Sequence, residues 1–161
     1  MTINLRSRTA ILRGAKIVIT EVGSYESNMQ DIAARAEVSR ATVYNHFSDK
    51  EEMMFSLMES EILRLIALAK SASSRRVALH LLSTEISSDP ALRKMVVTDP
   101  LDIAKFVTIS ENPLWVLVNS SLTELFGDSS GLILHWLIGQ VASPLTAADS
   151  AFQAEQLART L

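Results

Sequence analysis

The sequence predicts an all-α fold, in which an N-terminal three-helix unit is followed by a larger helical domain. Apolar residues recur at helical spacing along most of the chain, and no segment shows the alternation typical of a half-buried strand. Glycines, prolines and small polar residues stand where helix ends are expected. The chain has 161 residues, of which 48% are hydrophobic and 20% charged, so it can bury a core. We place the domain boundary at residue 50, which gives domains at 1–50 and 51–161.

The first helix is expected from Thr9 to about Val22. Its apolar positions follow the spacing i, i+4, i+7, i+11, and they are Ile11, Ala15, Val18 and Val22. Gly23 follows as a stop signal. The second helix is expected to begin at Asn28, because Asn is a strong N-cap and Asp31 stands three residues later, as in a capping box.

The segment from Asn28 to Phe47 predicts two short amphipathic helices joined by a tight turn at 36–39, with Ser39 capping the second. Val43 and Phe47 are four residues apart and share a buried face. The other face is polar, and each of its side chains can hydrogen-bond to a phosphate or a base edge. These residues are Arg40, Thr42, Tyr44, Asn45 and His46. The pattern indicates a helix-turn-helix whose second helix enters the DNA major groove. Spacing alone favours this interpretation and a merely solvated surface helix about equally.

A dense, ungapped set of residues supports the DNA-binding interpretation. The set consists of Asp31, Ile32, Ala33, Ala36, Val38, Ser39, Thr42, Tyr44, His46, Phe47, Lys50 and Glu51. With these residues, the segment from Ile11 to Leu57 resembles the N-terminal domain of the TetR family of transcriptional regulators. The pattern and the resemblance together predict DNA contacts from Asn28, Ser39, Arg40, Thr42, Tyr44, Asn45, His46 and Lys50.

Two positions depart from the family pattern. Glu37 replaces the glycine of the turn, so it is expected either to adopt a left-handed conformation at a cost or to shift the turn. Ala41 replaces a second glycine and adds a methyl group near the expected DNA backbone. Neither departure removes a predicted contact residue.

Charge and composition narrow the possible functions. Residues 1–50 carry a net charge of +2 and the remainder −5, which directs the N-terminal part towards phosphate. There is no cysteine, and no two of the three histidines are spaced as a metal pair on one helix. No catalytic or phosphate-binding motif is found, so we expect no enzyme, no metal and no cofactor. An apolar signal region is missing, and the longest apolar stretch is too short to span a bilayer, so a cytoplasmic protein without membrane contact is expected.

The second domain is expected to start with a long helix from Ser48, its predicted cap with Glu51 as partner, to about Lys70. Further helices are predicted at 75–87, 90–97, 101–109, 113–126, 130–142 and 148–161. The family resemblance implies a ligand pocket among the middle helices. The candidate effector-binding residues are Met58, Ile62, Met95, Phe106 and Trp115. For any one of them, ordinary core packing is slightly favoured. Few charges lie on these faces, which favours a mostly hydrophobic effector.

The helix at 130–142 is apolar nearly all round and therefore needs cover on both sides. A twofold dimer is the default cover, although a fully buried central helix in a monomer is the alternative. The predicted interface is Leu134, Leu137, Ile138 and Val141, completed by Phe152 and Leu157 on the last helix.

These observations predict a homodimeric regulator that binds double-stranded operator DNA and is released from it by a small molecule. Two alternatives stay open. One is a constitutive DNA binder whose second domain only dimerises, and the other is a small helical enzyme or carrier with a vestigial DNA-binding unit. The identity of the effector, the operator and the regulated genes, and the choice between repressor and activator, do not follow from the sequence.

Overall fold

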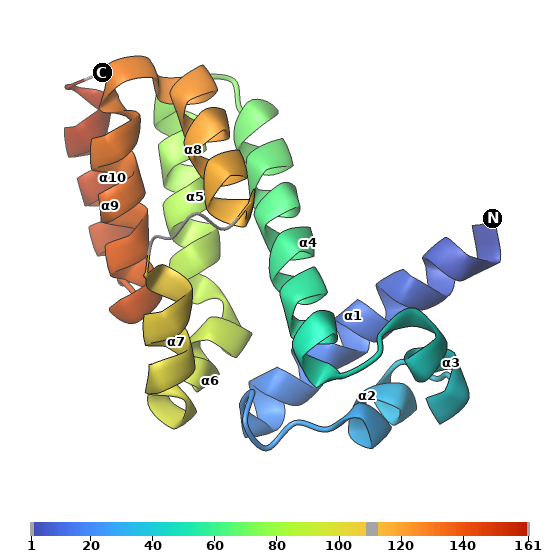
Figure 1. Cartoon of the computed structure of the whole chain (residues 1–161). Helices are drawn as coiled ribbons and strands as arrows, with labels where there is room; N and C mark the ends of the chain where they lie inside the picture. The colour runs from blue at the N-terminus through green and yellow to red at the C-terminus, as the bar shows by residue number, and fades with distance from the viewer. Residues whose placement is uncertain (1, 109–112, 161) are drawn as a thin grey trace.

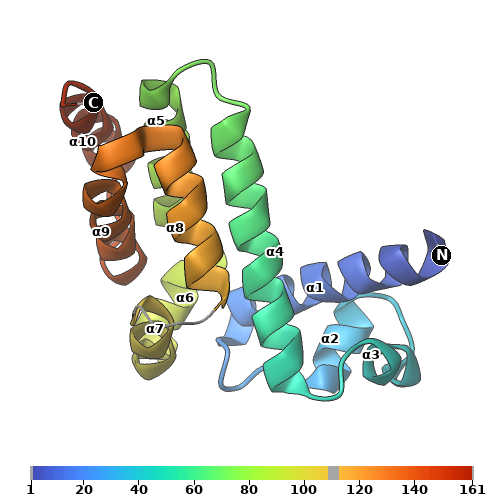
Figure 2. The same ribbon diagram turned by 45° about the horizontal axis from the view of Figure 1, so that its top comes forward.

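Helices form two packed groups joined by one long helix (Figure 1). The computed structural model describes residues 2–108 and 113–160. The N-terminal group comprises α1 (Thr2–Val22), α2 (Met29–Arg35) and α3 (Arg40–His46), and α4 (Lys50–Lys70) rises from it. The second group comprises α5 (Arg75–Ser88), α6 (Pro90–Thr98), α7 (Pro100–Val107), α8 (Pro113–Phe126), a short 3-10 helix η1 (Gly127–Ser129), α9 (Ser130–Ala142) and α10 (Ala147–Ala158). Figure 2 shows α9 and α10 at the side of this group farthest from α4.

The predicted helices are found, with one large difference at the start of the chain. Helix α1 begins at Thr2 rather than at Thr9. The apolar spacing marks only the part of α1 that packs, whereas nothing between Thr2 and Thr9 breaks a helix, so the helix extends beyond the core. The last residues of two predicted helices, Ile109 and Leu161, lie outside the described residues.

Local capping explains where the first helices begin. Asn28 Oδ1 accepts hydrogen bonds from the amides of Gln30 and Asp31, and Asn28 Nδ2 donates to Asp31 at 2.7 Å. Ser39 Oγ accepts from the amide of Thr42 at 3.0 Å. Both predicted caps are therefore confirmed.

The predicted cap of α4 was wrong by one residue. Asp49, not Ser48, caps the helix, and its carboxylate accepts from the amide of Glu52 at 2.8 Å. Glu52 in turn accepts from the amide of Ser48, the residue before the cap, at 2.7 Å. Ser48 and Asp49 are adjacent, and either residue type can cap a helix. The side chain that reaches the amide three residues after it is that of Asp49.

Helix α4 belongs to both hydrophobic cores. Met53 and Leu57 pack in the N-terminal core with residues of α1, α2 and α3, whereas Ala69 packs in the second core. Ala91 of α6 also reaches the N-terminal core. The two groups of helices consequently share α4 and α6 as structural connections, and a boundary at residue 50 leaves the first half of α4 packed on the domain before it.

A buried polar network orients the helices of the second group. Ser83 Oγ of α5 donates to Gln140 Oε1 of α9 at 2.7 Å and lies 2.6 Å from Ser150 Oγ of α10. Ser87 Oγ donates to the same Gln140 oxygen at 3.1 Å. Because a buried polar group without a partner is costly, this network favours one rotational setting of α9 over others.

Candidate nucleic-acid interface and internal cavity

Helix α3 presents a polar surface beside a fully buried one. Val43 and Phe47 are buried, whereas Arg40, Tyr44 and Asn45 are exposed. Thr42 and His46, the other two residues predicted on this face, are half-buried. The Arg40 guanidinium lies 5.5 Å from the centre of the Tyr44 ring, so the two side chains stack on the outer face of α3.

The other three predicted DNA contacts have structural partners of their own. Asn28 and Ser39 are the helix caps described above. Lys50 Nζ donates to the carbonyls of Tyr25 and Ser27, at 2.9 and 2.8 Å, and so ties the start of α4 to the loop between α1 and α2.

Glu37, in the turn before α3, stands where the family pattern has a glycine, and this substitution affects the backbone conformation. Glu37 has a φ of 55°, the left-handed conformation expected when this residue takes the place of the turn glycine. The left-handed conformation, the first of the two expectations, is therefore observed, and it places backbone strain at Glu37.

A cavity of about 740 Å³ lies between the N-terminal group and the second group of helices. All five residues predicted as effector contacts line it: Met58, Ile62, Met95, Phe106 and Trp115. The rings of Phe106 and Trp115 lie 6.0 Å apart, centre to centre, in a tilted arrangement. Helix α1 also contributes to the wall through Lys16 and Ile19, so the cavity is bordered by both groups.

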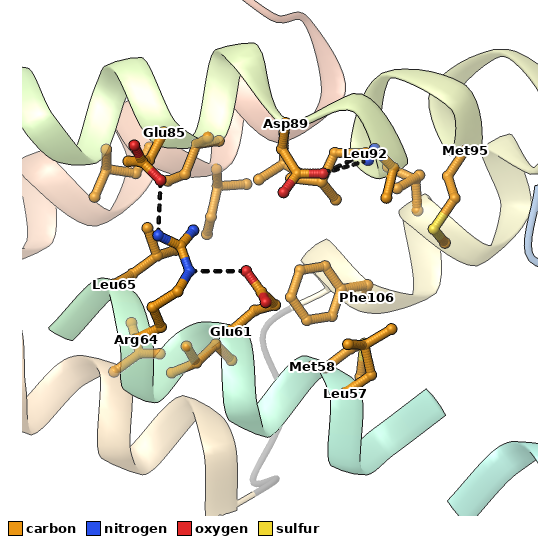
Figure 3. Close-up of a pocket in the computed structure, with 18 of the residues that line it drawn as sticks. Leu57, Met58, Glu61, Arg64, Leu65, Glu85, Asp89, Leu92, Met95 and Phe106 are labelled. Atoms are coloured by element: carbon orange, nitrogen blue, oxygen red, sulfur yellow. Dashed lines mark hydrogen bonds and ion pairs between the residues drawn. The ribbon is translucent and has the colours of Figure 1, made fainter. Parts of the chain in front are cut away.

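Charged side chains cross the mostly apolar wall in a continuous series, which we call the charge chain: Asp89, Lys16, Glu61, Arg64 and Glu85. Lys16 Nζ lies 2.6 Å from Asp89 and 2.8 Å from Glu61. Arg64 lies 3.0 Å from Glu61 and 2.7 Å from Glu85 (Figure 3). Burial by itself lowers the pKa of Lys16, but the hydrogen bonds and charges of Asp89 and Glu61 outweigh it and raise that pKa. The charge chain therefore connects α1, α4 and α5 with both cations ionised.

A second connection between the two groups centres on Asp99, which is 6% exposed. Its carboxylate accepts from the amides of Ser24 and Tyr25, at 2.9 and 3.0 Å, and from the hydroxyl of Thr98. Burial opposes ionisation of Asp99, but these hydrogen bonds outweigh it and lower the pKa of the carboxyl group. We call this arrangement the Asp99 junction. It holds the loop after α1 against the start of α7.

Comparison with known families decides the identity of the N-terminal group. The family described as bacterial regulatory proteins, tetR family, matches residues 11–57. The match spans most of α1, all of α2 and α3 and the start of α4, so this N-terminal group is similar to the N-terminal domain of that family. Within the matched segment, α2 and α3 stand where a helix-turn-helix is expected.

Two solved structures share the fold of this chain. The fatty acid degradation regulator FadR from Bacillus halodurans is 18% identical, with a TM-score of 0.64 over 94% of this chain and 93% of that one. A TetR-like transcriptional regulator from Rhodococcus sp. RHA1 is 22% identical, with a TM-score of 0.53 over the same shares. No curated protein matches the chain.

Within the described residues, no helix is both long and apolar enough to cross a membrane.

The structure corrects the predicted dimer stripe. Leu134, Leu137 and Val141 are buried within their own subunit and border the cavity, and Ile138 also lines it. Their i, i+3, i+4, i+7 spacing marks a continuous stripe, but this stripe faces the interior of the subunit. The hydrogen bonds of Gln140 to Ser83 and Ser87 favour this rotation of α9 about its axis. Among the six predicted interface residues, Leu157 is half-buried against the second core, and Phe152 is exposed.

The charge chain and the Asp99 junction were not predicted from the sequence. The pairs that join the two groups of helices are distant in sequence: Lys16 and Glu61 are 45 positions apart, and Ser24 and Asp99 are 75 apart. The one local signal is Lys16 itself, a cation in the middle of an apolar helix, which hints at a buried partner without naming it.

Proposed function

We propose that this chain is a transcriptional regulator of the TetR type, acting as a dimeric repressor that leaves its operator when a small, mostly hydrophobic molecule occupies the cavity. The observation that carries the proposal is the composition of the cavity wall. Lys16 and Ile19 belong to the DNA-binding group, and the remaining wall comes mainly from the second group of helices. A molecule in the cavity would contact both, so it could favour one relative position of the two. A difference of about 1–3 kcal/mol between the two positions is enough for a useful response.

Exposed polar side chains support α3 as the element that meets DNA. Arg40, Tyr44 and Asn45 combine charge, hydrogen-bonding groups and exposure on a helix whose opposite face is buried. Lys50 has a different role in this proposal: its ammonium group holds the loop after α1, so it would affect DNA binding mainly through the position of that loop. The fold likeness to a fatty acid degradation regulator agrees with an apolar effector.

The outward faces of α9 and α10 are the proposed dimer interface. Leu132 and Phe152 are 57% and 64% exposed there, and no atom lies within 4 Å of where a Cβ on Gly131 or Gly139 would stand. Trp136 Nε1 of α9 donates to Gln153 of α10 at 2.8 Å, which joins the two helices along this side. Large apolar side chains beside glycines allow a second copy to approach closely. A dimer would hold two copies of α3 about 34–36 Å apart, the spacing of successive major-groove half-sites.

The test measures operator binding and ligand response separately. Fluorescence anisotropy with the DNA upstream of the gene gives operator affinity, and a thermal-shift screen of small apolar compounds finds candidate ligands. A hit should weaken operator binding at least fivefold, the low end of typical allosteric coupling. Ile62→Trp, which fills the cavity, should keep operator binding and lose the response. Leu63→Trp, on the exposed side of the same helix, is the matched control.

The same experiment separates the alternatives. Tight operator binding that no hit changes would support a constitutive DNA binder. Absence of any specific DNA binding, with hits that still stabilise the protein, would support a carrier and contradict the proposal.

A further inference from the structure

The charged groups of the cavity wall are not balanced. Among the described residues, five carboxylates and four cationic side chains line it, and it has no histidine. Lys16 and Arg64 each already lie between two carboxylates, and the ammonium group of Lys50 is held by two backbone carbonyls. The side chain of the fourth cation, Lys105, is 80% exposed, where water screens its charge. An anionic ligand group would therefore find no poorly paired, sheltered cation.

The carboxylates differ in what they still offer. Asp89 is fully engaged, because one oxygen accepts from the amides of Ala91 and Leu92 and the other binds Lys16. Glu61 and Glu85 use Oε2 for their ion pairs, and Oε1 of each has no hydrogen-bond partner within the described part of the chain. The charge chain thus leaves two carboxylate oxygens available to a donor and none of its cations without a carboxylate.

An aromatic pair lines the same cavity as these two carboxylates. Figure 3 shows the ring of Phe106 beside Glu61, with Arg64 reaching between Glu61 and Glu85. Trp115 packs against Phe106, and both rings line the cavity. Aromatic faces and carboxylates attract the same partner, a cation that carries apolar substituents.

We propose that the cavity selects an amphipathic cation: an apolar body with one ammonium group that binds between Glu61, Glu85 and the Phe106–Trp115 pair. The inference rests on the ligand-responsive function proposed above and narrows the effector from mostly hydrophobic to hydrophobic and monocationic. The apolar body fills the rest of the wall, formed by side chains such as Met58, Leu65 and Leu92.

Binding of such a cation would also directly affect how the DNA-binding group is held. Glu61 holds Lys16 of α1 at 2.8 Å, and a ligand cation on Glu61 competes with that ion pair. The link between α1 and α4 would weaken as the ligand binds, which supplies a physical route from the cavity to the helix-turn-helix.

Three ligands of one chain length test the inference: decylammonium, decanol and decanoate, each below its micelle concentration and titrated by calorimetry at neutral pH. The cation should bind at least about tenfold more tightly than the alcohol, and decanoate should bind most weakly. Glu85→Gln keeps the size of the side chain and removes one charge, so it should reduce the preference for the cation over decanol at least threefold while decanol affinity stays within twofold.

Glu124→Gln is the matched control, because Glu124 forms an exposed ion pair with Lys70 outside the cavity wall. It should leave all three affinities unchanged. Raising the salt concentration on the unmodified protein is the second measurement, and it should weaken the cation selectively even if Glu85→Gln fails to fold.

Each outcome has a definite meaning. Equal affinities, or tightest binding of decanoate, would overturn the cationic inference and leave the ligand-responsive function intact. Failure of all three to bind, and of any screened compound to stabilise the protein, would overturn both.

Discussion

Replacing Gly23 by alanine should disrupt the Asp99 junction at the loop after α1. Gly23 has a φ of +91°, and a Cβ placed on it would collide with Thr98 Oγ1 and Asp99 Oδ2. The left-handed backbone costs an L-residue about 1–2 kcal/mol. Displacing Asp99 weakens its hydrogen bonds from the amides of Ser24 and Tyr25, and hydrogen bonds to a charged group contribute about 1.5–3 kcal/mol each. With partial retention of these bonds, we expect a total loss of about 3–5 kcal/mol in the free energy of unfolding.

Gly127 provides the matched control. It also has a positive φ, of +59°, but no atom lies within 4 Å of where its Cβ would stand, so Gly127→Ala carries the backbone cost alone. The gain from a stiffer unfolded chain is similar in both variants and cancels in the comparison. Gly23→Ala should therefore be less stable than Gly127→Ala by about 2–3 kcal/mol, which is about 1 M in the urea midpoint for a slope of about 2–3 kcal/mol per M.

Urea unfolding followed by circular dichroism measures both variants. Equal midpoints would refute the reasoning, because they would show that the contact between Gly23 and the Asp99 carboxylate contributes nothing beyond backbone strain. A Gly23→Ala protein too unstable to purify, beside a folded Gly127→Ala protein, agrees with the expected direction.

The junction, the α3 surface and the outer face of α10 give three further predictions. Asp99→Asn should lower the free energy of unfolding by about 1–3 kcal/mol at pH 7. Because the pKa of Asp99 is lowered on folding, its contribution is present above the pKa of the unfolded chain and is lost as pH falls through the folded value; stability curves of wild type and variant should converge in acid, and a constant gap would contradict this. Tyr44→Ala should weaken operator binding about tenfold with little change in melting temperature, as measured by anisotropy and thermal unfolding. Tyr25→Ala, at a more exposed tyrosine outside α3, should change neither the operator affinity nor the melting temperature. Unfolding of Tyr44→Ala would show that Tyr44 is a core residue instead. Phe152→Asp should give folded monomers in light scattering and lose tight operator binding, and an intact dimer would exclude this face as the interface.

The helix-turn-helix could be predicted from sequence because the signals that define it are local. Asn28 and Ser39 cap helices that begin one residue later, and Val43 with Phe47 marks a buried face within a single helix. The left-handed Glu37 was also within reach, since the turn itself demands that conformation. In each case the interacting atoms lie within about four residues of one another, so their geometry follows from the helix or the turn alone.

The direction of α9 was decided by tertiary structure. The spacing of Leu134, Leu137 and Val141 established a stripe, but a helix that is apolar nearly all round gives no second, polar face to show which side is outward. Gln140 settles the direction through Ser83 and Ser87, more than fifty residues away. For this reason Leu134, Leu137 and Val141 were wrongly placed in the predicted interface, whereas Phe152 stays a prediction.

The sequence by itself determined the helices, the helix-turn-helix and five of the apolar residues that line the cavity. The tertiary structure alone decided how that cavity is charged, because Lys16, Glu61, Arg64 and Glu85 come from three helices and meet only when α1, α4 and α5 pack together. Helical periodicity records which side of a helix avoids water, and it carries no information about which distant carboxylate will lie opposite a given cation.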